Sequence, residues 1–303
     1  MGDLRFDDRV VVVTGGGRGI GRSHALAFAA RGARVVVGDY GVDLDGNGSS
    51  PAPANEVVAQ IEAAGGTAVA CVADVSEEAS AASLVDIALD RFGRIDVVVN
   101  NAGISQPTLF EELTTAQFRR MVDVHYFGTL FTIRAAWPHF VAAGYGRIVN
   151  TMSESALGGL THFTSYAAAK GAVWALTRTL ATEGIDHGIA VNAIAPRAWS
   201  RMAERDAALV AATLGQAVGD PEVMQAMMPV AWNSPGALYL AHESCPLTGH
   251  VLQTGAGGIS CLAIVQTVGI PNGDATPEDI AAHIDAIIDV TAARVTGAER
   301  YAP

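Results

Sequence analysis

A glycine-rich turn between a predicted strand and a predicted helix constrains the fold of this chain most strongly. Residues 10–13 are consecutive valines, a β-branched run typical of a strand buried on both faces. The turn Thr14-Gly-Gly-Gly-Arg-Gly-Ile-Gly21 follows at once, and residues 23–31 are predicted to form a helix. Glycines at the start of a helix let backbone N–H groups approach a pyrophosphate closely. The segment therefore predicts a dinucleotide site in an α/β fold.

Strands and helices alternate along most of the chain. Further strands are predicted at residues 34–39, 67–72, 95–100, 146–152, 189–195 and 250–254. Helices are predicted at residues 54–64, 76–92, 114–141 and 166–186, with Ser76 as an N-cap and a capping box over Thr114-Thr-Ala-Gln117. This alternation gives a parallel sheet with helices on both faces. We therefore predict one Rossmann-type α/β domain over residues 1–303, doubly wound around a seven-stranded parallel sheet.

Acidic and amide side chains stand at the ends of these strands. Asp39 ends the second strand, where a carboxylate accepts hydrogen bonds from both hydroxyls of an adenosine ribose and repels a 2′-phosphate, so NAD is favoured over NADP. Asp74 follows the third strand, within reach of an adenine amino group. Asn100-Asn-Ala-Gly103 follows the fourth, where ligands of such sheets bind. For Asp39 the alternative is an ordinary surface aspartate in a turn. For Asp74 and residues 100–103 it is an ordinary tight turn, which Asn and Gly favour in any case.

Tyr166 and Lys170 lie four residues apart on a predicted helix, so their side chains project from the same face. A free tyrosine has a pKa of about 10 and is a poor proton shuttle at neutral pH. A nearby ammonium favours the phenolate, so we expect Lys170 to lower the pKa of Tyr166 and make it a usable general base or acid. Taken alone, such a pair is more often an ordinary feature of a partly exposed helix.

An acidic, cysteine-poor composition argues against several classes of protein. The chain has 19 Lys and Arg against 31 Asp and Glu, a net charge of −12, which disfavours a nucleic-acid surface. The three cysteines are far apart and form no CxxC pair, so neither a disulfide framework nor a metal site is indicated. We expect a cytoplasmic protein, because residues 1–6 lack a signal core, no apolar run reaches membrane-spanning length, and residues 301–303 are no peroxisomal address.

Three segments depart from the regular alternation. Residues 40–53 form a polar insertion, and residues 259–303 form a C-terminal extension with a helix predicted at 276–290. Residues 197–230 are rich in methionine and alanine. Methionine suits a mobile lid that closes over a bulky apolar substrate, and it equally suits ordinary core filling.

The glycine turn, Asp39, residues 100–103, Ser153 and the Tyr166–Lys170 pair together resemble the short-chain dehydrogenase/reductase family over nearly the whole chain. Within it, residues 92–104, 194–202, 242–245 and 254–257 are similar to a subgroup of peroxisomal multifunctional enzymes whose dehydrogenase unit oxidises (3R)-hydroxyacyl-CoA. The insertion 40–53 and the helix that opens at Thr276 are also similar to that subgroup. The acyl-CoA expectation rests on this resemblance, because we identify no CoA-binding motif.

The resemblance implies roles for four catalytic candidates. Tyr166 would take the proton of the substrate hydroxyl, while Lys170 would hold the nicotinamide ribose. Ser153 would hydrogen-bond the substrate oxygen and stabilise the charge that develops there. His125 stands where most of the family has asparagine, and a neutral histidine can also donate one hydrogen bond and accept one. It is therefore either part of a proton relay to Lys170 or a packed core histidine.

The resemblance also implies the set of residues that contact the cofactor. Arg197 follows Pro196 where the family usually has glycine, so the contacts on the nicotinamide side remain open. The implied contacts are Gly15, Arg18, Gly19, Ile20, Gly21, Asp39, Asp74, Val75, Asn101, Ala102, Gly103, Tyr166, Lys170 and Pro196.

We therefore predict an NAD-dependent dehydrogenase for a secondary alcohol of a bulky apolar substrate, with a (3R)-hydroxyacyl-CoA as the first candidate. A steroid or terpene alcohol is the alternative substrate, since the same fold and triad would serve it. A non-catalytic dinucleotide-binding sensor is the alternative from another class. The resemblance implies a homodimer or homotetramer, and no feature of the sequence supports a nucleic-acid or membrane partner.

Overall fold

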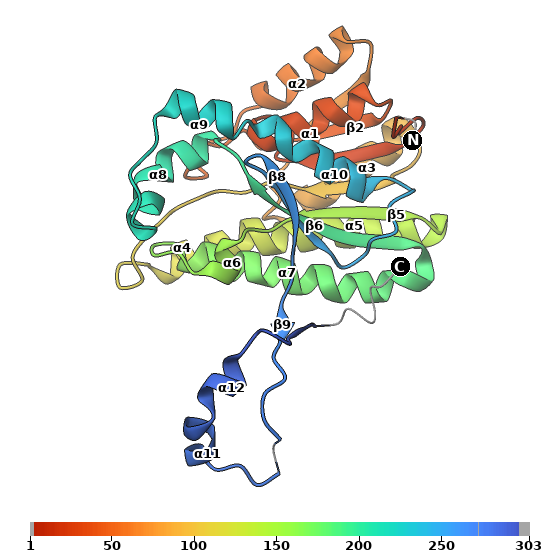
Figure 1. Ribbon diagram of the computed structural model, residues 1–303. Coiled ribbons are helices and arrows are strands. Elements are labelled where there is room, and N and C mark those ends of the chain that lie inside the picture. Colours follow the sequence, from red (N-terminus) through yellow and green to blue (C-terminus); the bar gives the residue numbers. More distant parts are fainter. Residues whose placement is uncertain (1–2, 272, 297–303) are drawn as a thin grey trace.

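An eight-stranded sheet in the order β3-β2-β1-β4-β5-β6-β7-β8 forms the centre of the protein (Figure 1). The computed structural model describes residues 3–271 and 273–296. The strands are β1 Val10–Thr14, β2 Arg34–Gly38, β3 Thr67–Cys71, β4 Val97–Asn100, β5 Gly146–Thr151, β6 Ile189–Arg197, β7 Val251–Gly255 and β8 Gly258–Leu262. Neighbours from β1 to β7 all pair in parallel, which confirms the predicted α/β class.

The prediction of seven strands is wrong by one. β8 runs antiparallel to β7 in a hairpin whose last pair joins Gly255 and Gly258. Between them, Ala256 and Gly257 have φ of 46° and 80°, and positive φ at both turn positions matches the twist of the flanking strands. This strand could not be predicted from the sequence. The turn before it places Ala256 at positive φ, which is uncommon for a non-glycine residue, and β8 itself is largely exposed.

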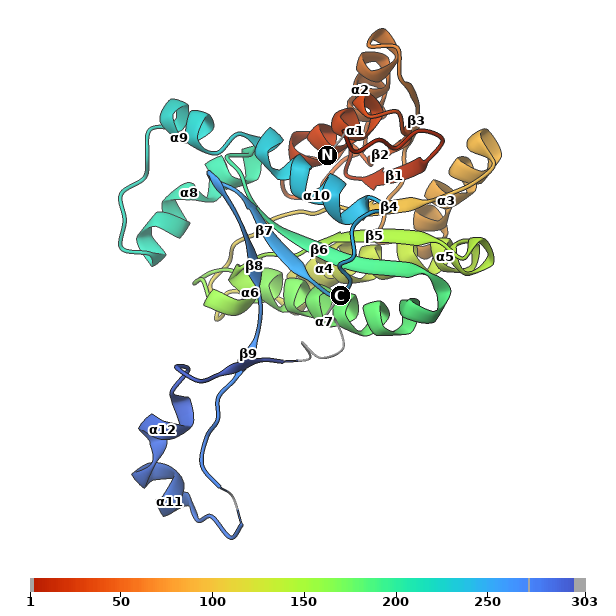
Figure 2. The ribbon, with the colours of Figure 1, turned by 45° about the vertical axis from the view of Figure 1, so that its right-hand side comes forward.

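Helices cover both faces of the sheet, as predicted (Figure 2). One layer contains α1 Gly19–Ala30, α2 Ala52–Ala63 and α10 Ser234–Ala241, and the other contains α3 Glu78–Phe92, α5 Gly128–Ala143 and α7 Thr164–Gly184. The valine run explains this two-sided packing, because side chains alternate across a strand. Val13 packs with Phe28 of α1, whereas Val12 packs with Leu84 of α3. All the valines of β1 are fully buried.

Two helix boundaries differ from the prediction. Ser76 is not the N-cap of α3, since that position falls on Glu77 and the Ser76 hydroxyl donates instead to Asp74 Oδ1 at 2.6 Å. The capping box of Thr114 with Gln117 is confirmed and starts α4 Thr115–Val122. A π-helical turn over Asp123–Phe127 then joins α4 to α5, so the predicted helix 114–141 is helical throughout but its hydrogen-bond pattern changes within it.

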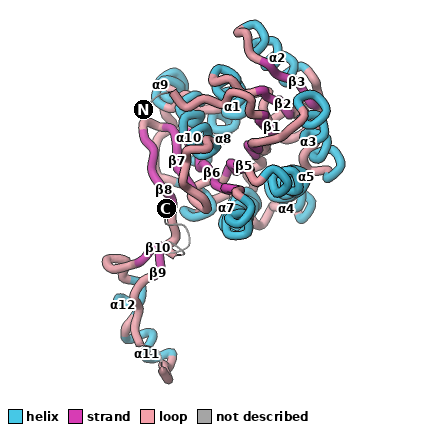
Figure 3. The backbone as a smooth tube through the Cα atoms, turned by 90° about the vertical axis from the view of Figure 1, so that its right-hand side faces the viewer, coloured by secondary structure: helices cyan, strands magenta, loops and turns pink. Residues whose placement is uncertain are grey.

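Residues 263–271 and 273–296 extend away from the sheet as an arm (Figure 3). Its base is a two-stranded pairing of β9 Val265–Gln266 with β10 Arg294–Val295. The helix predicted at 276–290 is instead two short helices, α11 Pro277–Ala282 and α12 Ile284–Ile288, because His283 leaves the helical conformation. No helix in the described part of the chain is long and apolar enough to cross a membrane. Residues 1–2 and 297–303 lie outside the described residues. The prediction that residues 301–303 are no peroxisomal targeting signal falls on this part of the chain.

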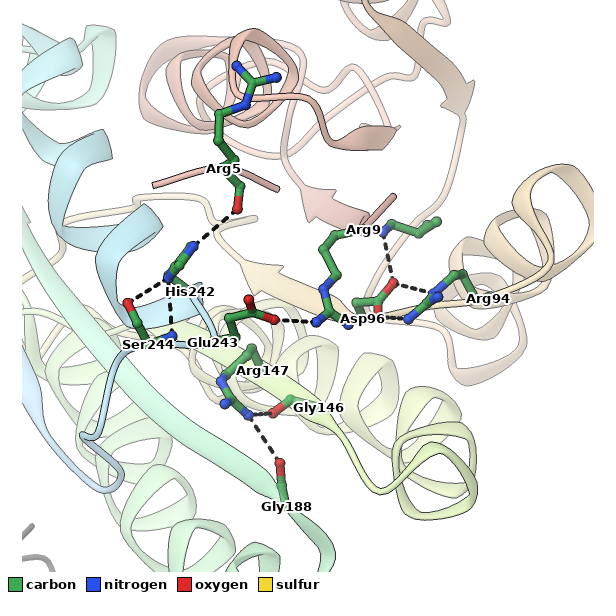
Figure 4. Close-up of polar contacts among 11 residues, drawn as sticks. Arg5, Arg9, Arg94, Asp96, Gly146, Arg147, Gly188, His242, Glu243 and Ser244 are labelled. Atoms are coloured by element: carbon green, nitrogen blue, oxygen red, sulfur yellow. Dashed lines mark hydrogen bonds and ion pairs between the residues drawn. The ribbon is translucent and has the colours of Figure 1, made fainter. Parts of the chain in front are cut away.

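A buried carboxylate joins three segments at the amino end of β4 (Figure 4). Asp96 is 1% exposed and accepts hydrogen bonds from Arg9 Nη1 at 3.0 Å, Arg94 Nη2 at 2.6 Å and the Val10 backbone N–H at 2.9 Å. Arg9 also forms an ion pair with Glu243. Since a buried charge must be paired and hydrogen-bonded, this cluster holds β1, β4 and the segment after α10 together.

Candidate active site

A cavity of about 590 Å³ opens at the carboxyl ends of the parallel strands, where such sheets bind ligands. It gathers nearly all the residues predicted to form the site. These are Gly15, Arg18, Gly19, Ile20, Asp39, Asp74, Val75, Asn101, Ala102, Gly103, His125, Ser153, Tyr166, Lys170 and Pro196. Gly21 is the exception, because it is buried beneath the turn and does not line the cavity.

The glycine turn has the shape that a dinucleotide phosphate needs. Gly15 has a φ of +62°, and a Cβ there would lie 2.8 Å from the Ala102 Cα. A Cβ on Gly21 would lie 2.1 Å from the Gly15 carbonyl oxygen, so only glycine lets α1 begin directly against the end of β1. α1 therefore begins directly behind a turn made mostly of glycines that lines the cavity, an arrangement that fits a pyrophosphate.

Thr14 and Asn101 lock this turn to the end of β4. The Thr14 hydroxyl oxygen accepts from the backbone N–H groups of Asn101 and Ala102, both at 3.0 Å. The Asn101 side chain donates to the carbonyls of Thr14 and Gly15, each at 3.1 Å. The sequence reasoning missed this role of Thr14, although the residue stands at the head of the predicted motif.

Asp39 is oriented at the cavity wall by two backbone donors. Its Oδ2 accepts from the Gly17 N–H at 2.8 Å, and its Oδ1 accepts from the Gly41 N–H at 2.7 Å. Each carboxylate oxygen has a second lone pair, so both can still accept from ribose hydroxyls. The residues present thus fit a bound adenosine ribose.

Ser153, Tyr166 and Lys170 meet on one wall of the cavity. Ser153 follows β5, and the other two lie on the first turns of α7. The Tyr166 and Ser153 hydroxyls are hydrogen-bonded. Lys170 Nζ donates to the Thr151 carbonyl at 2.7 Å and lies 5.7 Å from the centroid of the Tyr166 ring. A proton donor or acceptor, a polar hydroxyl and a cation therefore converge on one point.

The expected lowering of the Tyr166 pKa is not found in this chain. Burial raises the pKa of Tyr166 to about 12, the hydrogen bond with Ser153 opposes this rise, and the Asp206 carboxylate adds to it. Burial also lowers the pKa of Lys170 to about 7. Near neutral pH the lysine is therefore partly uncharged, and it favours the phenolate less than a full ammonium would.

His125 lies beside the tyrosine in the π-helical turn. Its ring packs edge-to-face against Tyr166 with centroids 5.1 Å apart, and its Nε2 is 2.8 Å from the Ile104 carbonyl oxygen. Burial, followed by the charge of Lys170, lowers the pKa of His125 well below its ordinary value, so the ring is neutral at pH 7. Gly103 makes room for it, since a Cβ there would lie 2.5 Å from the ring. The histidine is thus both a packed residue and a neighbour of the reacting group.

The segment predicted to be a lid contributes one helix to the cavity wall. It forms α8 Arg201–Thr213 and α9 Pro221–Met227, and residues of α8 and its approach line the cavity. Of the methionines in the segment, Met202 lines it. The sequence reasoning missed Asp206, a buried carboxylate in the middle of α8 that also lines the cavity.

Lys170 is the only lysine of the chain, and its burial gives a pH-dependent stability. Its folded pKa of about 7 lies below the ordinary lysine value of 10.5, so the unfolded chain binds more protons between these values. The cost of burying the ammonium is therefore complete below pH 7 and disappears as pH rises toward 10.5. Lys170→Met should be more stable than the original chain at pH 6.5, and this advantage should shrink steadily up to pH 9. Urea unfolding at several pH values measures it, and an advantage independent of pH would contradict the assignment.

Comparison with known proteins agrees with this geometry. The family model for short chain dehydrogenases matches residues 9–206. Peroxisomal multifunctional enzyme type 2 of Mus musculus is 41% identical over 290 residues, which cover 94% of this chain but only 37% of that enzyme.

Two solved structures share the fold over nearly their whole length. A short chain dehydrogenase from Mycobacterium avium has a TM-score of 0.77 and 36% identity, covering 93% of this chain and 95% of its own. A 7α-hydroxysteroid dehydrogenase complexed with NADH and 7-oxo glycochenodeoxycholic acid has a TM-score of 0.70 and 31% identity, covering 85% and 98%. The chain belongs to the short-chain dehydrogenase family and is an oxidoreductase that acts on CH–OH groups.

Proposed function

We propose that this protein is an NAD-dependent dehydrogenase that oxidises (3R)-hydroxyacyl-CoA esters to the 3-ketones. The observation that carries the proposal is that Ser153, Tyr166 and Lys170 share one cavity with the glycine turn and Asp39. The similarity to the mouse multifunctional enzyme, together with the sequence stretches shared with its subgroup, supports the substrate class. Since this chain spans about a third of that enzyme, only the dehydrogenase step is proposed.

The chain's own residues would divide the reaction between them. Tyr166 would accept the hydroxyl proton in its phenolate form, which the positive charge of bound NAD and of protonated Lys170 would favour, while Ser153 would donate a hydrogen bond to the substrate oxygen as the carbonyl forms. Lys170 would hold the nicotinamide ribose, and Asp39 would hold the adenosine ribose. Bound NAD would supply the acceptor for the hydride that leaves the carbinol carbon. His125 would pass protons between Lys170 and solvent, with its unpartnered Nδ1 as the free site.

A steroid alcohol is the second candidate substrate. The similarity to the 7α-hydroxysteroid dehydrogenase favours it, since that enzyme was solved in complex with NADH and 7-oxo glycochenodeoxycholic acid. The purified protein should be mixed with NAD and matched (3R)- and (3S)-hydroxyacyl-CoA esters, and NADH absorbance followed beside a panel of steroid alcohols. Turnover of the (3R) ester alone is expected. Turnover of a steroid alcohol without turnover of either ester would show that the substrate is a steroid and not an acyl-CoA. Binding of NAD without turnover of any alcohol would favour a dinucleotide sensor.

Removal of the Asp39 carboxylate should weaken the preference for NAD. Asp39→Ala is expected to raise the KM for NAD by about 10-fold to 100-fold, because hydrogen bonds from two ribose hydroxyls to a charged acceptor are lost. The KM for NADP should rise less or fall, since the repulsion of a 2′-phosphate goes with the carboxylate. Initial rates with each cofactor measure the ratio. Asp86→Ala, an exposed position on α3, is the matched control and should change neither KM.

We further propose a homodimer or homotetramer located in the cytoplasm. The arm supports self-association, because Val268 and Ile288 are 77% and 61% exposed and no other part of the described chain covers them. Light scattering on the full chain would give the mass. A monomer at micromolar concentration would overturn the oligomer, and membrane-bound or organelle-bound protein in cell fractions would overturn the location.

A further inference from the structure

Three segments that are far apart in the sequence meet at one buried ion pair beside the cavity. Asp206 of α8 accepts a hydrogen bond from the Ser105 hydroxyl at 2.6 Å through Oδ2. Its Oδ1 accepts from Arg205 Nε at 2.8 Å. The Asp206 side chain is only 6% exposed, so its charge depends on these partners.

Arg205 extends the same cluster to the loop between β2 and α2. Its Nη2 donates to the Ser105 carbonyl at 2.5 Å, and its Nη1 pairs with Asp45 Oδ1 at 2.8 Å. One planar guanidinium thus contacts α8, the segment after β4 and the loop 40–53, which an arginine can do because its donors point in fixed, divergent directions. We call Asp45, Ser105, Arg205 and Asp206 the clasp.

The loop that carries Asp45 is continuous with the proposed ribose site. Asp39 Oδ1 accepts from the Gly41 N–H at 2.7 Å, and Asp43 Oδ1 accepts from the N–H groups of Asp45 and Asn47 at 2.9 and 2.8 Å. These bonds make a short ordered path from Asp39 to Asp45. Asp43 also lines the cavity, whereas Asp45 does not.

Few other contacts hold α8 in place. Asp206 is the one buried residue of the helix, so no apolar core anchors it. At its far end, the hydroxyls of Thr213 and Thr161 lie 2.5 Å apart on the surface. Because the clasp supplies most of the polar contacts of α8, we expect the helix to open and close as one unit when these bonds break and form.

We propose that Arg205 and Asp206 are positioning residues that couple the ribose loop to the lid helix, so that cofactor binding at Asp39 and closure of α8 over Tyr166 favour each other. The inference rests on the proposed function, since it requires NAD at the glycine turn. Coupling of this kind is reciprocal, so a change that loosens α8 also weakens NAD binding. Ordered closure would position the substrate only after the cofactor is bound.

Asp45→Asn tests the coupling, because it removes the charge from the tie between Arg205 and the loop and changes no residue that lines the cavity. Amide hydrogen exchange should be followed in peptides that cover the glycine turn, residues 40–53 and α8, with and without NAD. In the unaltered chain, NAD should slow exchange in all three. In Asp45→Asn, NAD should still protect the glycine turn, but protection of α8 should largely disappear and the KM for NAD should rise by about twofold to fivefold, as for a partly exposed pair.

Two further variants make the outcome decisive. Arg205→Gln should speed exchange of α8 and residues 40–53 even without NAD, and adding Asp45→Asn to it should change nothing more. Arg134→Gln removes an exposed ion pair with Glu78, neither of which lines the cavity, and should match the original chain in every measurement. Unchanged exchange of α8 in Arg205→Gln, or full NAD protection of α8 in Asp45→Asn, would overturn the coupling. Absence of NAD protection at the glycine turn itself would overturn the proposed cofactor, and the coupling with it.

Discussion

Replacing Tyr166 with phenylalanine is expected to lower kcat by on the order of 10²-fold to 10⁴-fold, the usual contribution of a positioned acid or base. The change removes one oxygen atom from a partly buried ring and leaves the contact with His125 intact. Ser153 is a poor replacement, because its hydroxyl oxygen already accepts a hydrogen bond from Ser155 at 3.0 Å and no basic side chain is bonded to it. Steady-state rates with the (3R) ester measure the loss.

Binding of NAD separates a chemical effect from a structural one. Tyr166→Phe should bind NAD with nearly unchanged affinity, as measured by calorimetry, since the phenol acts on the substrate. Tyr126→Phe, a neighbouring tyrosine that does not line the cavity, is the matched control and should keep full activity. A Tyr166→Phe enzyme with more than a tenth of the original kcat would contradict the role of the phenol.

Asp96→Ala is expected to lower the free energy of unfolding by about 3 kcal/mol, near the lower end of the range for a broken buried pair. The change leaves the Val10 N–H without its acceptor and leaves two guanidiniums without their shared carboxylate. The arginine side chains are 24% and 46% exposed, so water recovers part of their solvation and limits the loss. Urea unfolding monitored by circular dichroism measures it.

The position of Asp96 makes this a test of stability alone. The cluster lies at the amino ends of the strands, at the opposite edge of the sheet from the cavity, so KM and kcat of the folded fraction should not change. Asp90→Ala on the exposed side of α3 is the matched control, with an expected change within about 0.5 kcal/mol. A loss below 1 kcal/mol for Asp96→Ala would show that the cluster is mostly solvated.

The order of strands and helices could be predicted because runs of apolar, often β-branched residues indicate the strands. Those from β1 to β7 are parallel strands at the positions predicted, with ends that differ by a few residues. The predictions that were wrong concern a residue with a competing hydrogen-bond partner and a strand that is largely exposed. Ser76 bonds to Asp74 rather than capping α3, and β8 has little buried surface to mark it.

The site residues that could be predicted are polar side chains that directly follow the parallel strands. Carboxyl ends of parallel strands meet at one edge, so Asp39, Asn101 and Ser153 had to approach one another. The pKa of Tyr166 could not be predicted, because burial outweighs the pair with Lys170 and depends on everything packed around it. The clasp could not be predicted either, because Ser105 and Asp206 are 101 positions apart and no spacing rule connects them.

The single lysine gives this protein a spectroscopic label of its own. A chain grown with isotopically labelled lysine shows one side-chain amine, and that amine is Lys170, buried 2.7 Å from the Thr151 carbonyl. Its chemical shift against pH reports the charge of the cavity directly, with no assignment step and no substitution. Amine-directed crosslinkers should find no exposed lysine side chain on this chain, because Lys170 is only 3% exposed.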